Sequence, residues 1–333
     1  MPVLVVVVGT TDISLIPGIS IAGASPELTH YTPAADVEYL LTGMPRSIPA
    51  IPVTPQGIPT PAVITRALTR GVPKLIAFAG GRVAPKVPYV DLGGAPGGDF
   101  RRGPALPKAA VETILDRGRV LGRELAKLGE VYIGESIPGG TTTAMAILIG
   151  LGYDAWGKTS SAGPQNPKEL KRTVVEEGLK RLGGRPRDPV EALAELGDPV
   201  HIGVAAIALG VLEEGGRPVL AGGTQMAAAA AIVKALGGDV SKLSVVTTRW
   251  IVEDKTADFL GLMREVGVGD VKYSRASFAG SKYPGLRAYE EGYVKEGVAM
   301  GAALWRAEAV GLDVLGLVER EYEELLRRGA HGA

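Results

Sequence analysis

Short apolar runs alternate with longer amphipathic stretches along most of the chain. Five runs have the length and composition of buried strands: Val3–Val8, Lys74–Ala79, Glu130–Ile133, Pro218–Leu220 and Leu243–Thr247. Helical periodicity is found in six stretches: Pro107–Leu128, Thr141–Leu151, Asn166–Leu182, Val200–Glu214, Thr224–Leu236 and Val310–Arg328. This alternation predicts βαβ units in an α/β fold with a mainly parallel sheet, and ligands bind such sheets outside the carboxyl ends of the strands.

Two stretches interrupt this pattern, residues 9–65 and 82–106. The first is rich in Pro, Gly, Thr and Ser and has little periodicity. The apolar content of the whole chain, 46%, is high enough for a sizeable core despite 47 Gly and 24 Pro. We therefore expect loops and short helices that pack on the sheet.

Composition and charge narrow the function classes. The chain has 36 basic and 36 acidic residues, and this balance argues against nucleic-acid or membrane-surface binding. The lack of cysteine excludes disulfides, thiolate zinc sites and a cysteine nucleophile. The apolar start lacks a basic signal-peptide region, and no apolar run reaches the roughly 18–20 residues of a membrane span. We expect a cytoplasmic protein.

The amide side chains are scarce, with one Asn and three Gln in 333 residues. Depletion of Asn, Gln and Cys is typical of thermophiles, although biased codon usage gives the same result. The four amides are Gln56, Gln165, Asn166 and Gln225, and they lie in predicted loops or helix starts. They are either turn and capping residues or side chains retained to bind a ligand.

The segment Gly134–Ala144 follows a predicted strand and opens a predicted helix. Gly139 and Gly140 allow close approach of the backbone to an anion, and Thr141 and Thr142 add hydroxyl donors. The segment has neither the Lys-Ser/Thr of a Walker loop nor the second Gly of a nucleophile elbow. It predicts a phosphate cradle; the alternative is a well-capped strand–helix turn.

Two further loops carry charged or hydroxyl side chains. Lys158 and Lys168 flank a Thr-Ser-Ser segment that could complete an anion site or simply cap the next helix. Glu253 and Asp254 follow an apolar run, as in the pyrophosphate–ribose loop of ordinary phosphoribosyltransferases, but the usual Thr/Ser-Gly tail is absent. Surface acids are the favoured interpretation of that pair.

A fourth segment lies close to the C-terminus. Ser281 begins Ser-Lys-Tyr-Pro-Gly, which ends at Gly285, and Glu296 precedes a helix start that is rich in small residues. The Glu296 carboxylate either favours the helix dipole or faces a cleft as a general base.

Taken together, residues 130–305 resemble the nicotinate-nucleotide–dimethylbenzimidazole phosphoribosyltransferase family, especially a divergent archaeal-type branch. The motifs involved are Gly134-Glu135 with Gly-Thr-Thr at 140–142, the 157–168 loop, Pro-Val-Leu-Ala-Gly-Gly-Thr at 218–224, Ser281 to Gly285, and Glu296-Gly297. The N-terminal base-binding region matches only through Gln56 and Gly57. The family's motifs have this same order.

The resemblance implies a doubly wound, Rossmann-like nucleotide-binding core over residues 66–305. A smaller domain would be assembled from residues 1–65 and 306–333, and the protein would be a homodimer. The implied reaction transfers phosphoribose from nicotinate mononucleotide to a benzimidazole-like base, and it needs neither a cofactor nor a metal. Glu296 would be the base and Glu135 would stabilise the sugar cation, while the 139–142 turn, Lys158 or Lys168, Ser281 and Gly285 would bind phosphate and ribose.

Two alternatives remain open on the sequence. The chain could be a catalytically silent nucleotide-binding protein on the same fold. It could also be a magnesium-dependent phosphoribosyl or nucleotide-hydrolysing enzyme that uses Glu253 and Asp254.

Overall fold

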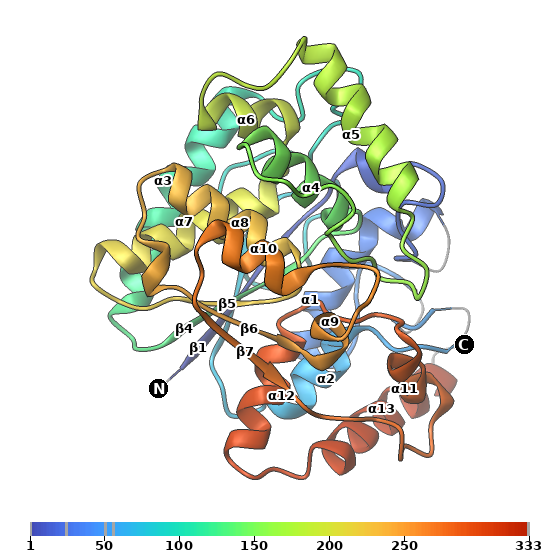
Figure 1. Ribbon diagram of the computed structural model, residues 1–333. Coiled ribbons are helices and arrows are strands. Elements are labelled where there is room, and N and C mark those ends of the chain that lie inside the picture. Colours follow the sequence, from blue (N-terminus) through green and yellow to red (C-terminus); the bar gives the residue numbers. More distant parts are fainter. Residues whose placement is uncertain (1, 24–25, 50–51, 55–56, 332–333) are drawn as a thin grey trace.

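The computed structural model describes residues 2–23, 26–49, 52–54 and 57–331. In this part of the chain, a seven-stranded sheet with all strands parallel has the order β3-β2-β1-β4-β5-β6-β7 (Figure 1). The strands are β1 (Val3–Gly9), β2 (Lys74–Gly80), β3 (Val90–Asp91), β4 (Val131–Ser136), β5 (Val219–Ala221), β6 (Ser244–Thr248) and β7 (Asp270–Ser274). The predicted α/β fold with a doubly wound parallel sheet is confirmed.

Helices connect the strands and cover both faces of the sheet. The α-helices are α1 (Thr32–Thr42), α2 (Pro61–Leu68), α3 (Lys108–Ala126), α4 (Gly140–Gly150), α5 (Lys168–Leu182), α6 (Pro189–Leu196), α7 (Pro199–Glu213), α8 (Gln225–Ala235), α9 (Arg249–Val252), α10 (Phe259–Val266), α11 (Pro284–Arg287), α12 (Met300–Ala309) and α13 (Val314–His331). The short 3₁₀ helices are η1 (Asp12–Leu15), η2 (Pro26–Tyr31), η3 (Val240–Lys242) and η4 (Ala288–Glu291).

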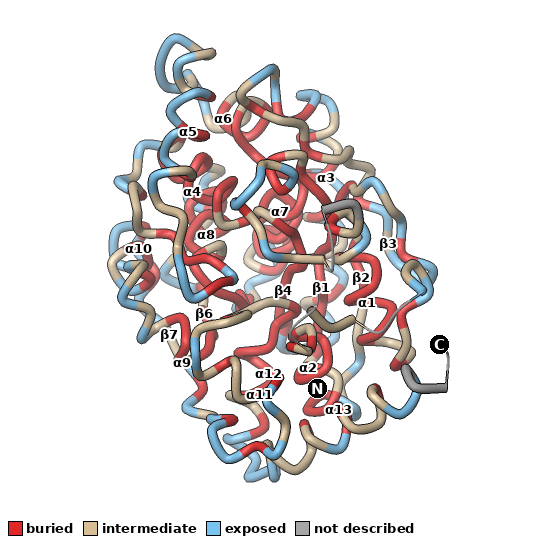
Figure 2. Tube along the Cα trace, turned by 90° about the vertical axis from the view of Figure 1, so that its right-hand side faces the viewer, coloured by how far each residue is buried: buried red, intermediate tan, exposed pale blue. Residues whose placement is uncertain are grey.

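β1 is an interior strand of the sheet and is buried on both faces, which explains its uninterrupted apolar sequence. Its residues contribute alternately to two hydrophobic clusters. Val3, Val5 and Val7 pack in the cluster that contains α3, α4, α7 and α8, whereas Leu4, Val6 and Val8 join α2, α12 and α13. Figure 2 shows the resulting buried layers around β1 and β4, with exposed residues on the outer turns of α5 and α10.

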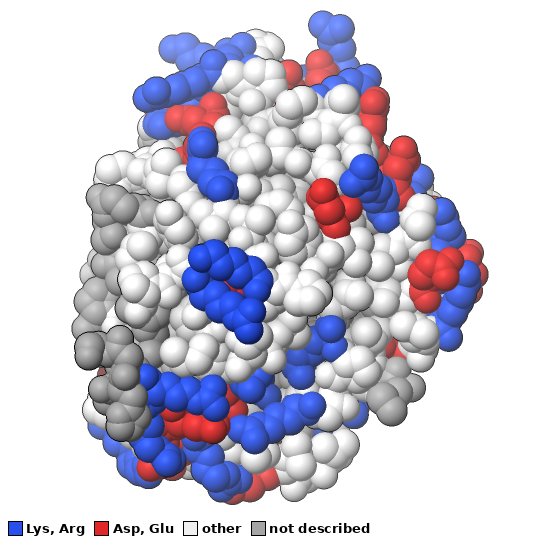
Figure 3. Space-filling view, turned by 180° about the vertical axis from the view of Figure 1, so that it is seen from behind, with Lys and Arg blue, Asp and Glu red and all other residues white. Residues whose placement is uncertain are grey.

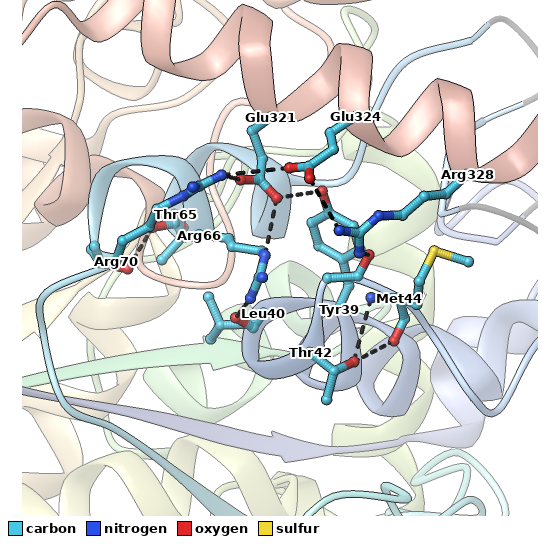
Figure 4. A network of polar contacts seen from close by, with 12 residues as sticks. Tyr39, Leu40, Thr42, Met44, Thr65, Arg66, Arg70, Glu321, Glu324 and Arg328 are labelled. Atoms are coloured by element: carbon cyan, nitrogen blue, oxygen red, sulfur yellow. Dashed lines mark hydrogen bonds and ion pairs between the residues drawn. The ribbon is translucent and has the colours of Figure 1, made fainter.

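The C-terminal helix α13 is attached to α1 and α2 through one buried acid. Glu321 accepts hydrogen bonds from the Tyr39 hydroxyl at 3.0 Å, from Arg66 Nε at 3.0 Å and from Arg70 at 2.7 Å (Figure 4). Helices α1 and α2 therefore lie together with the C-terminal helix α13. However, β1 lies within the sheet, so the N-terminal segment also contributes to the core, and the division into two domains stays a prediction.

All five predicted strands are present, but β3 and β7 were not expected. β7 has the sequence Asp-Val-Lys-Tyr-Ser at the edge of the sheet, and its residues are mostly exposed or half-buried. Because an edge strand needs no continuous apolar run, its sequence carries little signal. Only pairing with β6 reveals it.

Charged side chains of both signs are mixed over the face seen in Figure 3, and much of the middle of that face is uncharged. None of the helices in the described ranges is long and apolar enough to cross a membrane.

Candidate active site

A cavity of about 280 Å³ opens at the carboxyl ends of β1 and β4. These two strands are where the order of the sheet reverses, which is where doubly wound folds bind ligands. The lining comes from segments far apart in the chain. It consists of residues 19–23, Leu28 and the α1 residues Thr32, Ala35 and Asp36, residues 48–49, 52–54 and 58–61 of the Pro-rich stretch, the β4–α4 turn 135–141, Ala162, Gln225, and residues 294 and 296–298 before α12. The fold therefore brings together regions that are almost 280 residues apart in the chain.

The β4–α4 turn presents the start of a helix to the cavity. Gly139 has φ +76°, and a Cβ there would lie 3.0 Å from the backbone of Ser14, so the turn requires glycine. Gly139, Gly140 and Thr141 line the cavity at the N-terminus of α4. Thr142 lies behind this wall: it is fully buried, and its hydroxyl has no hydrogen-bond partner within the described residues. The turn therefore has the dipole and the accessible hydroxyl that suit an anion.

Glu296 occupies both positions that the sequence left open, at the start of a helix and facing a cavity. Its carboxylate accepts hydrogen bonds from the Gly301 N–H at 2.9 and 3.1 Å and from the Gly297 N–H at 3.0 Å, at the start of α12. The same side chain lines the cavity. Burial, with a smaller contribution from the charge of Glu135, raises the pKa of Glu296 to about 8.

The loop that carries Glu296 is held in an unusual conformation. Three non-glycine residues have left-handed φ angles: Val294 (47°), Val298 (52°) and Ala299 (60°). Val298 donates its N–H to the Glu135 carbonyl at 2.8 Å, and its own carbonyl accepts from the Thr65 hydroxyl at 2.8 Å. Such strain persists only where neighbours fix the backbone, and it is concentrated at functional sites.

Glu135 is the second acid of the cavity and lies near the end of β4. It is 3% exposed, and its Oε1 accepts a hydrogen bond from Gln225 Nε2 at 3.0 Å. Burial raises its pKa to about 7, although the positive charge of His201 opposes this rise.

Asp36 is a third acid of the cavity, which the sequence analysis missed. It comes from α1 and accepts hydrogen bonds from the Thr60 hydroxyl at 2.6 Å and the Ser136 hydroxyl at 2.7 Å. Burial raises its pKa to about 6, with both hydroxyls acting in the opposite direction. The available signal was an acid within an apolar helical stretch, since such an acid is buried only for a reason.

The electrostatic character of the cavity follows from these acids. Among the described residues that line it, none is lysine or arginine. Three carboxyl groups therefore share the cavity, and burial is the main cause of the raised pKa of each. The cavity is suited to a ligand that brings positive charge or gives up a proton.

The two predicted lysines lie elsewhere. Lys158 pairs with Asp154 at 2.9 Å and with Glu265 at 3.4 Å, and Lys168 begins α5; neither lines the cavity.

Two other lysines are buried behind the loop of residues 160–163. Lys295 donates to the carbonyls of Ser161 at 2.9 Å and Gly163 at 2.8 Å, and Lys171 donates to the Ser160 carbonyl. Ala162, within this loop, lines the cavity. Lys171 shares the buried face of α5 with Val174 and Val175, an apolar setting that could have marked it in the sequence.

Gly285 meets Gly57, and neither these two residues nor Ser281 lines the cavity. Ser281 donates its hydroxyl to Glu319 of α13 at 2.7 Å. A Cβ on Gly285 would lie 2.1 Å from the Gly57 carbonyl, which accepts from the Tyr322 hydroxyl at 2.6 Å. These residues attach α13 to the Pro-rich stretch. Gln56 lies outside the described residues.

The acidic pair considered for magnesium is divided between two environments. Glu253 is exposed and lies 3.4 Å from Arg249. Asp254 accepts from the Ser160 and Thr256 hydroxyls, both at 2.6 Å, and contacts Lys295. In the described ranges, no group of three or more His, Asp or Glu could hold a metal. The pair therefore does not present two free carboxylates to one ion.

Comparison with known proteins places this geometry in a family. The family model DBI_PRT, described as a phosphoribosyltransferase, matches residues 78–251, more than half of the chain. The chain belongs to this phosphoribosyltransferase family. The resemblance predicted from the sequence is thus confirmed, and the protein is a pentosyltransferase.

Relatives of this phosphoribosyltransferase include UPF0284 proteins of archaea. The Pyrobaculum aerophilum protein is 69% identical over 330 residues, which cover 99% of this chain and 97% of that protein. The Pyrococcus furiosus protein is 52% identical, with 96% of this chain and 98% of that protein covered.

The fold is shared with a solved structure, the nicotinate-nucleotide-dimethylbenzimidazole phosphoribosyltransferase of Thermus thermophilus. The TM-score is 0.63 at 17% identity, and the match covers all of this chain and 86% of that one. At this identity the likeness shows the architecture alone.

Proposed function

We propose that this phosphoribosyltransferase transfers phosphoribose from nicotinate mononucleotide to a benzimidazole-like base. The products would be an α-linked riboside 5′-phosphate and nicotinate, as in lower-ligand synthesis for cobamides. The observation that carries the proposal is that Glu296 and the Gly139–Thr141 turn line one cavity. A base and an anion seat are thus available to one bound nucleotide.

The bond changes match the charges of the cavity. The nucleotide's glycosidic bond breaks, and the electron pair returns to the pyridinium nitrogen, so nicotinate leaves with that nitrogen neutral. A nitrogen lone pair of the incoming base forms the new bond to C1′, and the proton on its other nitrogen passes to Glu296. The raised pKa of Glu296 makes its carboxylate a strong proton acceptor once the cationic ring has favoured the ionised form.

The remaining cavity residues have separate roles in this proposal. The Glu135 carboxylate stabilises positive charge that develops on the ribose. The N-terminus of α4 and the Thr141 hydroxyl hold the 5′-phosphate and so fix the ribose for attack. Neither Lys158 nor Lys168 takes part, because neither lines the cavity. The apolar residues of the Pro-rich stretch fit a flat apolar base: Ile48, Pro49, Pro52, Val53 and Ile58.

The test is an assay of nicotinate release from nicotinate mononucleotide with a panel of bases, including dimethylbenzimidazole. We expect base-dependent release with stoichiometric formation of the riboside phosphate, and this activity should survive a chelator. Binding of the nucleotide without release in any mixture would favour the silent binding protein. Release that requires magnesium but no base would favour the hydrolase.

The family resemblance also leads us to propose a homodimer. Light scattering of the purified protein should give twice the chain mass, and a mass of one chain would contradict it.

A further inference from the structure

A row of polar side chains leads from the cavity into the core beneath the sheet. Gln225, at the start of α8, donates from Nε2 to Glu135 Oε1 at 3.0 Å, and its Oε1 lies 2.8 Å from His201 Nε2. On the other side of the ring, His201 Nδ1 lies 2.5 Å from Asp198 Oδ2. His201 and Asp198 are both completely buried, so only Gln225 and Glu135 of this polar row reach the cavity.

The inner end of the polar row is fixed by Asp198. This residue caps α7, and its Oδ1 accepts the N–H groups of Val200 and His201, both at 2.9 Å. Its Oδ2 also accepts from the Thr143 hydroxyl of α4 at 2.5 Å. Burial would raise the pKa of Asp198, but His201 and these hydrogen bonds outweigh it, so the pKa lies below its ordinary value. Asp198 is therefore a fixed anion in the core.

The outer end is fixed by close packing. A Cβ on Gly140 would lie 2.0 Å from Gln225 Oε1, so the amide is seated directly against the first turn of α4. This turn is the proposed anion seat. The polar row therefore contacts α4 twice, through Gln225 against Gly140 and through Asp198, which accepts from the Thr143 hydroxyl.

Proton counting limits the polar row to two arrangements. With the amide as described, His201 Nε2 lies at hydrogen-bond distance from the Gln225 Oε1 acceptor, so Nε2 carries a proton. Nδ1 does not meet hydrogen-bond geometry, but it lies 2.5 Å from Asp198 Oδ2, a contact that two unprotonated acceptors would not make, so Nδ1 carries a proton as well. Gln225 then donates to an ionised Glu135. If the amide is reversed, Gln225 donates to a neutral ring nitrogen, and its oxygen needs a proton from Glu135. The two arrangements contain the same number of protons.

The charges around the row favour the first arrangement. Asp198 faces the imidazole from its own helix and Glu135 faces it from β4. Burial lowers the pKa of His201, but these two acids outweigh it, so the pKa is raised above its ordinary value. The charges of Asp198, Asp36 and Glu296 oppose the ionisation of Glu135, and that of His201 favours it. The imidazolium is therefore the cation that the lining of the cavity lacks.

We propose that Asp198, His201 and Gln225 are positioning residues that keep Glu135 ionised and oriented toward the sugar, with the Gln225 amide coupling the charge of the imidazole to that of Glu135. This inference rests on the proposed function for the catalytic value of Glu135, but the proton arrangement itself does not.

The decisive measurement is the ring ¹⁵N NMR spectrum of histidine-labelled protein as a function of pH. The chain has only three histidines, His30, His201 and His331, and the His201→Asn spectrum assigns the signal. We expect two protonated ring nitrogens for His201 at pH 7. Glu135→Gln should lower the titration midpoint by at least twice the shift in Asp36→Asn, the control that removes a neighbouring charge outside the row. A neutral His201 at pH 7, or equal midpoints in both variants, would overturn the proposal.

Kinetics test the catalytic part with Gln225→Met, which keeps the side-chain length but removes the amide. We expect kcat to fall about tenfold or more, KM for the nucleotide to change less than about twofold, and the acidic limb of the kcat profile to move to higher pH, because Glu135 loses a donor. An unchanged limb and kcat would refute the positioning role. If the parent protein shows no turnover, the proposed function fails, whereas the NMR result still judges the polar row.

Discussion

Asp254, which contacts Lys295, and Glu296, which follows Lys295 in the chain, have pKa values shifted in opposite directions. Asp254 lies 3.2 Å from the Lys295 ammonium group and accepts two hydroxyl hydrogen bonds, and its pKa is below the ordinary value despite burial. Glu296, the next residue after Lys295, faces a cavity without a cation and has its pKa raised to about 8. Burial disfavours the ionised form of a carboxyl group unless a cation or hydrogen-bond donors compensate. An acid that is paired in this way stabilises the fold, whereas an unpaired acid can exchange a proton with a ligand.

The largest effect should come from the unpaired acid. Glu296→Gln keeps the shape and the hydrogen-bond acceptor for the helix but cannot take the proton, so kcat for nicotinate release should fall by roughly 10²–10⁴-fold. Glu253→Gln is the matched control on the exposed neighbour of Asp254, and it should retain the parent rate. Comparable losses in the two variants would contradict the contrast and favour the hydrolase.

The paired acid should instead reveal itself in stability. Lys295→Met leaves the Asp254 carboxylate without its cation in a site where its side chain is 4% exposed, and the free energy of unfolding should fall by about 3–5 kcal/mol. Denaturant unfolding at pH 7 measures this. Lys158→Met removes an exposed pair and should cost less than about 1 kcal/mol. Equal losses would mean that burial does not distinguish the two pairs.

The pH dependence of stability sharpens the same contrast. Because the pKa of Glu296 rises from 4.5 to about 8 on folding, the unfolded chain binds fewer protons in this window, and stability falls as the pH rises through it. Glu296→Gln removes that fall. At pH 8 the variant should be more stable than the parent by roughly 2–4 kcal/mol, and near pH 4.5 the two should be equal. A constant difference across the pH range would exclude this linkage.

The smallest effect concerns two adjacent threonines. Thr141 lines the cavity, so Thr141→Val should weaken binding of nicotinate mononucleotide about 3- to 10-fold, the value of one hydrogen bond. Thr142→Val is the matched control: its hydroxyl is buried behind the wall, and the affinity should stay unchanged. Calorimetric titration of both variants with nicotinate mononucleotide measures the two affinities. A loss of affinity in Thr142→Val and not in Thr141→Val would contradict the proposed position of the anion seat.

Much of the architecture could be predicted from the sequence because its signals are local. The apolar run Val3–Val8 indicated a buried strand, and β1 is a fully buried interior strand of the sheet. The Gly139–Thr141 turn was recognisable because, in any fold, glycine at a strand–helix junction permits a tight turn and the start of the helix presents free N–H groups. Glu296 was found from its place before a helix and from the family resemblance.

The sequence could not show which polar and charged side chains contact one another. Asp36 and Ser136 are 100 residues apart, yet their side chains are hydrogen-bonded. Lys158 lies in a polar loop and was therefore chosen from the sequence, but it forms an ion pair with Asp154 at the surface. Lys171, which was not chosen, is buried.

The chain alone thus determined the succession of the main strands and helices along the sequence, because hydrophobic periodicity acts between near neighbours. Only the tertiary structure decided the chemical character of each acid. That character depends on loss of water and on the nearest partner, and both arise when remote segments pack together. Lys295 and Glu296 are consecutive in the chain, yet one neutralises a buried acid and the other remains an unpaired acid in the cavity.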